Sequence, residues 1–280
     1  MSKTLISNIE NFPTRTPLEI YNSVNERYKE NPNGFSFWFN KIKGVKEFKQ
    51  PKTAVIPIDF ELYSLIMNVY DHVPEAEDEC REKLTDRIED ARIEAGIDYP
   101  MFMKTGLFSN KFEFHTCLQL YKEHVADHYL NINYAAMCMS CDAATEIVIR
   151  ELIKVKPFMH LYEGLPMNIE YRCFINFNTK KIVAINDYWH ESIQNDIPTS
   201  QKGSFLMMKS RQTEAYDRYK EIVIEKLNKD INNFHLSGSW SVDIMVDIFG
   251  DLWITDMAIA PQSWGKHLLT EQERIDLDAK

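Results

Sequence analysis

Two short runs of alternating apolar residues near the C-terminus, joined by a three-residue turn, constrain the fold of this chain most. The runs span 239–248 and 252–257, and Phe249-Gly250-Asp251 between them predicts a tight antiparallel hairpin. Asp243 lies in the first run and Asp256 at the end of the second, at similar distances from the turn. We therefore expect the two carboxylates to face each other across the strand pair, where a hard cation such as Mg²⁺ would relieve their repulsion. The alternative is an edge hairpin whose acids face water.

The rest of the chain mixes helical and strand-like segments without strict alternation, which is typical of an α+β fold. The pattern changes near residue 98, so we expect an N-terminal α+β segment over 1–97 and a larger unit over 98–280. Helical character is found at 18–29, 60–70, 75–95, 118–130 and 212–232, with Gly96 as the cap of the third helix. Strand character is found at 35–39, 53–58, 100–106, 146–155, 169–177 and 181–189.

Composition narrows the classes of function. The formal charge of −10 argues against broad binding to nucleic acid, because phosphate contacts need a basic surface. No apolar run reaches the roughly eighteen residues of a membrane span, and the N-terminus lacks the apolar region of a secretory signal. Five cysteines, an odd number without a disulfide framework, favour a reducing compartment. We expect a cytoplasmic protein that binds neither nucleic acid nor membranes.

Common catalytic signatures are absent or incomplete. The sequence has no P-loop, no dinucleotide-binding glycine motif and no nucleophile elbow. Cys138-Met-Ser-Cys141 supplies only half of a zinc site. His124 and His128 lie four residues apart, but Val125 stands where the zinc-protease motif has glutamate. We expect ordinary surface or core roles for these cysteines and histidines.

Charged side chains inside apolar strand-like runs are the next signal, because an unpaired charge is costly there. Lys104 closes Met101-Phe-Met-Lys, Arg150 stands in Ile147-Val-Ile-Arg, and Glu170 and Arg172 share one face of a strand. A structural ion pair explains each of them singly. Arg172 also suits a phosphate clamp, since its guanidinium is planar and permanently charged. Beside the acids of the hairpin, these cations favour a cradle for a phosphorylated ligand.

The order of these motifs over about residues 98–262 resembles the ATP-grasp superfamily. It is similar in particular to RimK-like peptide ligases, to a predicted peptide-ligase branch found in viruses, and to the eukaryotic initiation-factor assembly chaperones built on the same fold. The resemblance implies ATP and Mg²⁺ as cofactors. It also implies a smaller lobe over 98–155 and a larger lobe over 156–280 that enclose the nucleotide. The 1–97 segment would then be a pre-ATP-grasp-like part for acceptor binding or partner docking.

The resemblance implies a role for each candidate residue. Lys104 would contact the α-phosphate, with Lys111 in the loop that follows. Arg150 takes a place where lysine is more usual, and the backbone of the next three residues would meet the adenine. Arg172 is the implied catalytic residue, facing the γ-phosphate. The implied nucleotide-binding residues are Lys104, Lys111, Arg150, Glu151, Leu152, Ile153 and Glu170, and the implied metal ligands are Asp243 and Asp256.

The sequence departs from the family pattern at two places. The loop after Lys104 has no glycine beyond Gly106, whereas the family loop is usually glycine-rich. The last family motif is an acid, one residue and then Asn, but Asp256-Met257-Ala258 lacks that Asn and with it one metal ligand.

Three activities follow as expectations. The resemblance implies an ATP- and Mg²⁺-dependent ligase that joins a small-molecule or peptide carboxylate to an amine through an acylphosphate. The departures keep open an ATP-binding assembly chaperone or protein-binding module, with a protein partner and little or no ligase turnover. The third is a nucleotidyltransferase in which Lys104 becomes adenylylated.

Overall fold

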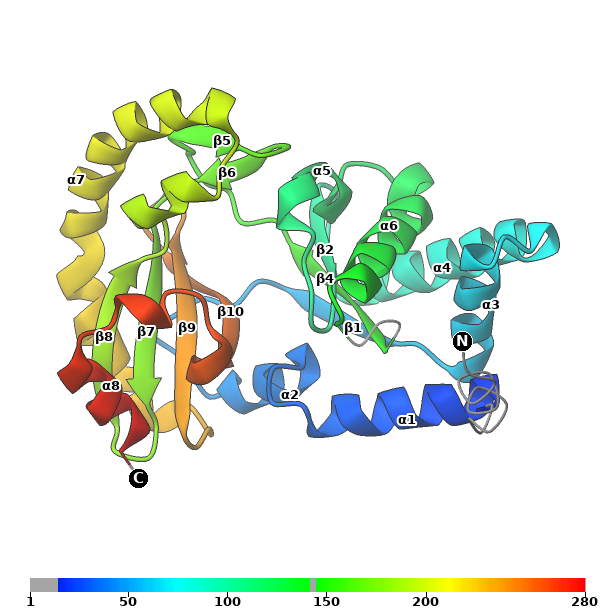
Figure 1. Cartoon of the computed structure of the whole chain (residues 1–280), viewed down its shortest axis with the longest axis horizontal. Helices are drawn as coiled ribbons and strands as arrows, with labels where there is room; N and C mark the ends of the chain where they lie inside the picture. The colour runs from blue at the N-terminus through cyan, green and yellow to red at the C-terminus, as the bar shows by residue number, and fades with distance from the viewer. Residues whose placement is uncertain (1–14, 142–144, 280) are drawn as a thin grey trace, which may run out of the picture.

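The computed structural model describes residues 15–141 and 145–279 of the chain. Two four-stranded antiparallel sheets lie side by side, each with its own helices (Figure 1). We call the sheet with strand order β1-β4-β2-β3 and its helices the smaller lobe, and the sheet with order β10-β9-β7-β8 and its helices the larger lobe. This arrangement confirms the predicted α+β class.

The smaller lobe packs three helices, α3, α4 and α6, against its sheet and one another. Helix α4 is charged at most positions, yet Ala76, Cys80, Leu84 and Ile88 recur every four residues and are buried in the core. Its outer side carries ion pairs spaced four residues apart. The strands are β1 (Thr53–Pro57), β2 (Met101–Thr105), β3 (Leu118–Gln119) and β4 (Glu146–Glu151), and the helices are α3 (Phe60–Tyr70), α4 (Pro74–Glu94), α5 (Phe114–Cys117) and α6 (Val125–Cys138).

The larger lobe has its core on one face of its sheet and the polar residues of the sequence prediction on the other. Tyr171 and Cys173 of β7 are buried in the core, so Glu170 and Arg172 lie on the opposite face, as predicted from the period of two. Helix α7 curves along the outer side of this lobe (Figure 1). The strands are β5 (Met159–Leu161), β6 (Leu165–Met167), β7 (Glu170–Asn176), β8 (Lys181–Asp187), β9 (Ser239–Val246) and β10 (Leu252–Ile259), and the helices are α7 (Thr199–Asp230) and α8 (Glu271–Asp278).

The N-terminal segment contributes to both lobes. Helix α1 (Pro17–Glu30) runs beneath the smaller lobe, and α2 (Phe35–Phe39) packs into the core of the larger lobe (Figure 1). Strand β1 then completes the smaller sheet by pairing with β4. The domain boundary at residue 97 stays a prediction, because it concerns which parts of the chain fold independently.

Two predicted elements are wrong. Residues 35–39 are a helix and not a strand, since Phe35, Trp38 and Ile42 bury one helical face in the core of the larger lobe. The predicted helix at 118–130 begins only at Val125, after the short strand β3. The 3₁₀ helices in the described ranges are Asn40–Ile42, Lys111–Glu113, Lys122–His124, Glu191–Asn195, Ile231–Asn233, Ala260–Gln262 and Lys266–Leu268.

Local sequence signals explain where several helices start and stop. Thr16 and Glu19 form a capping box at the start of α1, and Asp59 caps α3 by accepting a hydrogen bond from the Leu62 N–H. Gly96 follows α4 with a φ of 61°, the left-handed conformation that ends many helices, as predicted. None of the helices in the described ranges combines the length and apolar character that a bilayer crossing requires.

Candidate functional site

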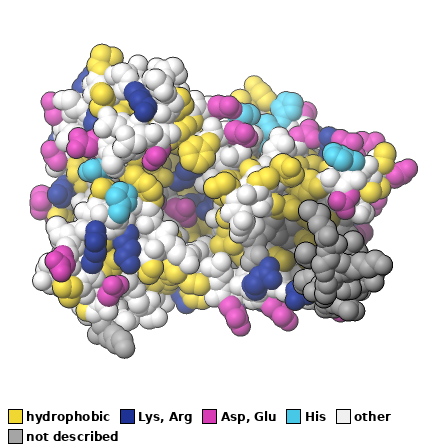
Figure 2. All heavy atoms as spheres, in the orientation of Figure 1, with side chains coloured by type: hydrophobic (Ala, Val, Ile, Leu, Met, Phe, Trp, Pro, Cys, Tyr) yellow, Lys and Arg dark blue, Asp and Glu magenta, His cyan; other side chains and the backbone are white. Residues whose placement is uncertain are grey.

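A cleft between the lobes gathers most of the residues singled out in the sequence. Its walls come from β2, β4 and the loop after β2 on one side, and from β6, β7, β10 and the residues after β8 on the other. Hydrophobic, basic and acidic side chains meet in the hollow between the two lobes (Figure 2). The predicted residues that line it are Lys104, Lys111, Arg150, Glu151, Leu152, Ile153, Glu170 and Asp256. Arg172 and Asp243 lie at its edge, bonded to each other.

A β-bulge brings the two carboxylates of the C-terminal hairpin together. Ile254 pairs with Ile244, but the register then shifts so that Asp256 pairs with Asp243, which leaves Thr255 as the extra residue. In an unbroken register, Asp256 would lie opposite Val242 and point into the core, because side chains alternate between the two faces. The predicted pairing of the acids is thus confirmed. Their role as metal ligands stays a prediction.

Arg172 and Asp243 form a bidentate ion pair at the cleft edge. The Nε of Arg172 donates to Oδ1 of Asp243 at 2.8 Å, and one terminal nitrogen donates to Oδ2 at 2.7 Å. The other terminal nitrogen donates to the Trp264 carbonyl at 3.0 Å. Burial alone lowers the pKa of Arg172, but Asp243 outweighs burial and raises the pKa above the usual value. The guanidinium is therefore fixed in orientation, with Asp243 as its counter-ion.

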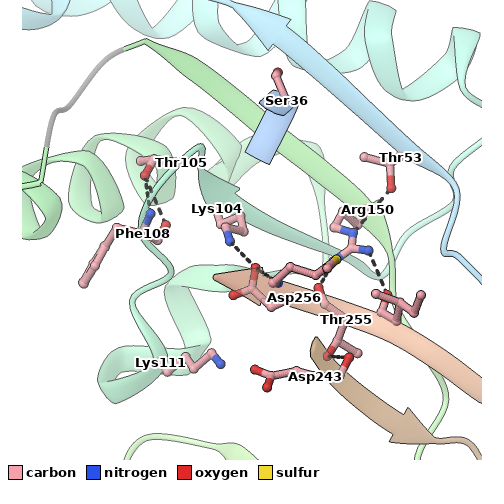
Figure 3. A network of polar contacts seen from close by, with 12 residues as sticks. Ser36, Thr53, Lys104, Thr105, Phe108, Lys111, Arg150, Asp243, Thr255 and Asp256 are labelled. Atoms are coloured by element: carbon pink, nitrogen blue, oxygen red, sulfur yellow. Dashed lines mark hydrogen bonds and ion pairs between the residues drawn. The ribbon is translucent and has the colours of Figure 1, made fainter. Parts of the chain in front are cut away.

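Asp256 lies among three cations from the smaller lobe. Lys104, itself almost fully buried, places its Nζ 3.3 Å from Oδ1 of Asp256 (Figure 3). Burial raises the pKa of Asp256, but Lys104, Lys111 and Arg150 together hold it below the usual value. Burial also lowers the pKa of Arg150 to about 10. Arg150 donates hydrogen bonds to the carbonyls of Ile254 and Thr255 and so spans the two lobes.

Lys111 connects the loop after β2 to the larger lobe. Its Nζ donates to the Tyr188 hydroxyl at 2.8 Å, and in Figure 3 it points toward Asp243. The ring of Tyr188 also lies under Arg172, 4.6 Å from the guanidinium carbon to the ring centroid. Burial lowers the pKa of Lys111, but Tyr188, Glu170 and the two aspartates outweigh burial and raise it. Tyr188 therefore holds one cation from each lobe.

Glu170 is the third acid of the cleft and is 6% exposed. The Thr255 hydroxyl donates a long hydrogen bond of 3.5 Å to its carboxyl. Burial is the main cause that raises the pKa of Glu170 to about 7, with Lys111 acting in the other direction. Near neutral pH this carboxyl is therefore partly protonated.

The cleft also has apolar walls and open backbone groups. Its walls include Phe102, Leu165 and Met245. Leu152 and Ile153 directly follow β4. Their backbone N–H and C=O groups make no hydrogen bond to the residues that the structure describes. Such an arrangement suits a flat aromatic base, which needs apolar faces and a few edge contacts.

The donor set is suited to Mg²⁺ together with phosphate. Asp243 and Asp256 offer carboxylate oxygens side by side, and Mg²⁺ is commonly held by one or two carboxylates plus substrate phosphates and water. Within the described ranges, no three His, Cys, Asp or Glu side chains come together as a complete metal site. A Mg²⁺ ion here would therefore depend on the ligand for the rest of its coordination. The missing Asn at Ala258 is consistent with that dependence.

Asn168, Tyr188 and Thr255 are polar lining residues that were not predicted from the sequence. Asn168 has the same strand parity as Glu170 and Arg172, so the period of two could have indicated it. Tyr188 directly follows β8, and its neighbour Trp189 is buried in a core cluster as well as lining the cleft. Thr255 reaches the cleft through the bulge, for which the sequence carries no clear signal.

The cysteine and histidine patterns do not converge on the cleft. No cysteine or histidine is among the described residues that line it. Cys138 is exposed and Cys141 half-buried after α6. His124 and His128 contact each other through their rings, with His128 also bonded to Gln119 at 2.9 Å, in agreement with ordinary structural roles.

Comparison with known proteins places the fold. No known protein family matches the sequence, and no curated protein matches it. Cdc123 from Schizosaccharomyces pombe is similar over 90% of this chain and 92% of that chain, with a TM-score of 0.52 at 16% identity. A C-terminally truncated form gives a TM-score of 0.51 at 18% identity, over 88% of this chain and 91% of that chain. N5-carboxyaminoimidazole synthetase from Staphylococcus aureus, complexed with ADP, is similar at a TM-score of 0.41 and 12% identity, over 81% of this chain and 44% of that chain. The similarity over 90% of the chain confirms the prediction from the sequence: this chain has the ATP-grasp fold.

Proposed function

We propose that the cleft binds ATP together with Mg²⁺ and that the chain is an ATP-dependent carboxylate–amine ligase. The observation that carries the proposal is the set of charged side chains that converge in one cleft. Four cations from four separate segments, Lys104, Lys111, Arg150 and Arg172, converge with three acids, and the same cleft also offers apolar walls and open backbone groups. The charged groups suit a triphosphate with its metal, and the apolar walls suit a purine base.

The charged residues of the cleft have distinct tasks in this proposal. Lys104, Lys111 and Arg150 bind the phosphate chain, and Arg172 neutralises the charge that develops on the γ-phosphoryl group during transfer. Asp243 and Asp256 would hold Mg²⁺, which supplies charge neutralisation on the phosphate oxygens when bound. Tyr188 keeps Lys111 and Arg172 in place from the larger lobe.

The chemistry needs no nucleophile from the protein. A substrate carboxylate oxygen attacks the γ-phosphorus, the bond to the β-phosphate oxygen breaks, and ADP leaves. An amine then attacks the acyl carbon, loses a proton and expels inorganic phosphate to leave an amide. The part of the cleft that the structure describes offers no cysteine or histidine nucleophile, in agreement with this route. Adenylylation of Lys104 fits less well, since its ammonium lies against Asp256 and a nucleophile must be a free amine.

A second candidate is an ATP-binding assembly chaperone or protein-binding module with little or no turnover. The observation in its favour is Ala258, two residues after Asp256, where the family pattern has a metal-binding Asn. With one ligand fewer, the chain would still bind Mg–ATP but hold the metal less firmly during phosphoryl transfer. The nucleotide would then serve to fix the two lobes around a partner.

Hydroxylamine trapping separates the two activities. The purified chain is incubated with Mg–ATP, hydroxylamine and pools of amino acids or short acidic peptides, and hydroxamate and ADP are measured. A ligase forms hydroxamate and ADP in equal amounts with at least one pool, and the Arg172→Lys variant loses this product. If ATP binds tightly but no pool raises ADP formation above the rate measured without acceptor, the result would favour the chaperone.

A further inference from the structure

We propose that Asn168 donates a hydrogen bond from its side-chain amide to a ring nitrogen of the bound purine. Asn168 lies between β6 and β7 in the wall of the cleft, and its side chain is only 1% exposed. The Nδ2 atom has no hydrogen-bond partner among the residues that the structure describes. This inference rests on the proposed nucleotide site and adds how that site recognises the base.

The orientation of the amide is fixed by its neighbour. Nε1 of Trp189 donates to Oδ1 of Asn168 at 3.4 Å, and an indole N–H can only donate. The carbonyl oxygen of Asn168 must therefore face Trp189, which leaves Nδ2 as the atom without a partner. A buried amide donor without an acceptor destabilises the folded chain by about 1–3 kcal/mol, so such a group calls for an explanation.

The neighbours of Asn168 in the cleft favour the base as its ligand. It lines the same cleft as the backbone of Leu152 and Ile153 and the apolar side chains of Leu165 and Met245. A purine presents ring nitrogens that only accept hydrogen bonds, which is what an unpartnered N–H requires. A backbone carbonyl after β4 can accept a hydrogen bond from the exocyclic amine of adenine, and Asn168 donates one to a ring nitrogen.

Purine analogues in which one ring nitrogen is replaced by carbon test this directly. Calorimetric titrations compare ATP with 7-deaza-ATP, 3-deaza-ATP and 1-deaza-ATP, all with Mg²⁺, on the wild-type chain and on Asn168→Ala. We expect one analogue to bind the wild-type chain about tenfold more weakly than ATP, the effect of one hydrogen bond. Asn168→Ala should lose about the same factor for ATP and bind that analogue as well as it binds ATP.

Asn186 provides the matched control. Its Nδ2 is also buried without a partner among the described residues, but it lies on β8 in a groove that does not belong to the cleft. Asn186→Ala should keep the wild-type ratio of ATP to analogue affinity. Equal affinity of the wild-type chain for ATP and all three analogues would overturn the inference, as would a preference that persists unchanged in Asn168→Ala. No binding of ATP at all would instead overturn the proposed function.

Discussion

Asp256 is the cross-strand partner of Asp243, and the single extra residue Thr255 in β10 makes it so. Each of the two carboxylates already has a cation of the protein beside it, Arg172 at Asp243 and Lys104 at Asp256. A free Mg²⁺ ion must compete with these cations for the same oxygens. Phosphate groups that bind Lys104 and Arg172 would release the carboxylates for the metal, so we expect ATP and Mg²⁺ to bind cooperatively and Mg²⁺ alone to bind weakly. Titration of Mg²⁺ in the absence of nucleotide, followed by titration in its presence, measures this coupling.

The buried pair of Arg172 and Asp243 should show strong coupling in a double-mutant cycle. Arg172→Ala leaves an uncompensated buried carboxylate and should destabilise the chain by about 3–5 kcal/mol. The double variant Arg172→Ala with Asp243→Asn should recover part of this loss, because the remaining charge is gone. Denaturant unfolding of the four proteins provides the free energies. Strictly additive single effects would contradict the described pair.

Tyr188 should affect nucleotide binding through two separable contacts. Tyr188→Phe removes the hydroxyl that accepts from Lys111 but keeps the ring under Arg172. We expect ATP affinity to fall about tenfold, the effect of one charge-assisted hydrogen bond at its weak end, with little change in thermal stability. Tyr188→Leu removes the ring as well and should weaken binding further. Equal affinities for the wild-type chain and both variants would show that Tyr188 does not position the cations.

Gly106, directly after β2, is expected to tolerate no side chain. A Cβ at this position would lie 2.0 Å from the Tyr28 hydroxyl and 2.7 Å from Oε1 of Glu146. Gly106→Ala should therefore destabilise the chain by about 1–3 kcal/mol and displace the loop that carries Lys111. Gly203→Ala in α7, where a Cβ meets nothing within 4 Å, is the matched control and should stabilise by about 0.5–1 kcal/mol. Thermal unfolding of both variants checks the contrast, and equal effects would contradict it.

Glu170 should make stability fall as pH rises toward neutrality. The pKa of an exposed glutamate is 4.5, and burial is the main cause that raises the pKa of Glu170 to about 7 in the folded chain. Between these values the folded chain binds the proton that the unfolded chain has lost, so folding is favoured at the low end of the window and loses this advantage as pH rises through 7. Glu170→Gln, which mimics the protonated form, should lack this slope. The difference in unfolding free energy between the two proteins, measured from pH 4.5 to 7.5, tests it, and a constant difference would refute the account.

Regular periodicity explains which parts of the fold were predictable. The alternation along β7 predicted that Glu170 and Arg172 share one face, and the helical character of 75–95 predicted α4. The aromatic run at 35–39 misled because Phe35, Phe37 and Phe39 alternate as in a strand, whereas Phe35 and Trp38 have the spacing of a helix face. Phe35 and Trp38 are buried against the larger lobe, and this contact between distant parts of the chain stabilises the helix.

The site was predictable where charge and burial conflict, and not where geometry is irregular. Lys104, Arg150 and Asp243 stand inside apolar strands, which marked them in the sequence. Thr255 could not be found, because a bulge depends on the pairing of two strands and not on the residue itself. Tyr188 could not be placed, since it follows the end of β8, where the tertiary packing sets the direction of the chain.

Calorimetric titration of ATP, with and without Mg²⁺, tests the central claim most directly. It compares the wild-type chain with Asp256→Asn and with Asp251→Asn, a control in the same hairpin that pairs with Lys49 at the surface. We expect tight, Mg²⁺-dependent binding to the wild-type chain and to Asp251→Asn, and about a hundredfold weaker binding to Asp256→Asn, equivalent to about 2.7 kcal/mol. Absence of ATP binding to the wild-type chain, or equal binding by all three proteins, would contradict the assignment of the cleft as a Mg–ATP site.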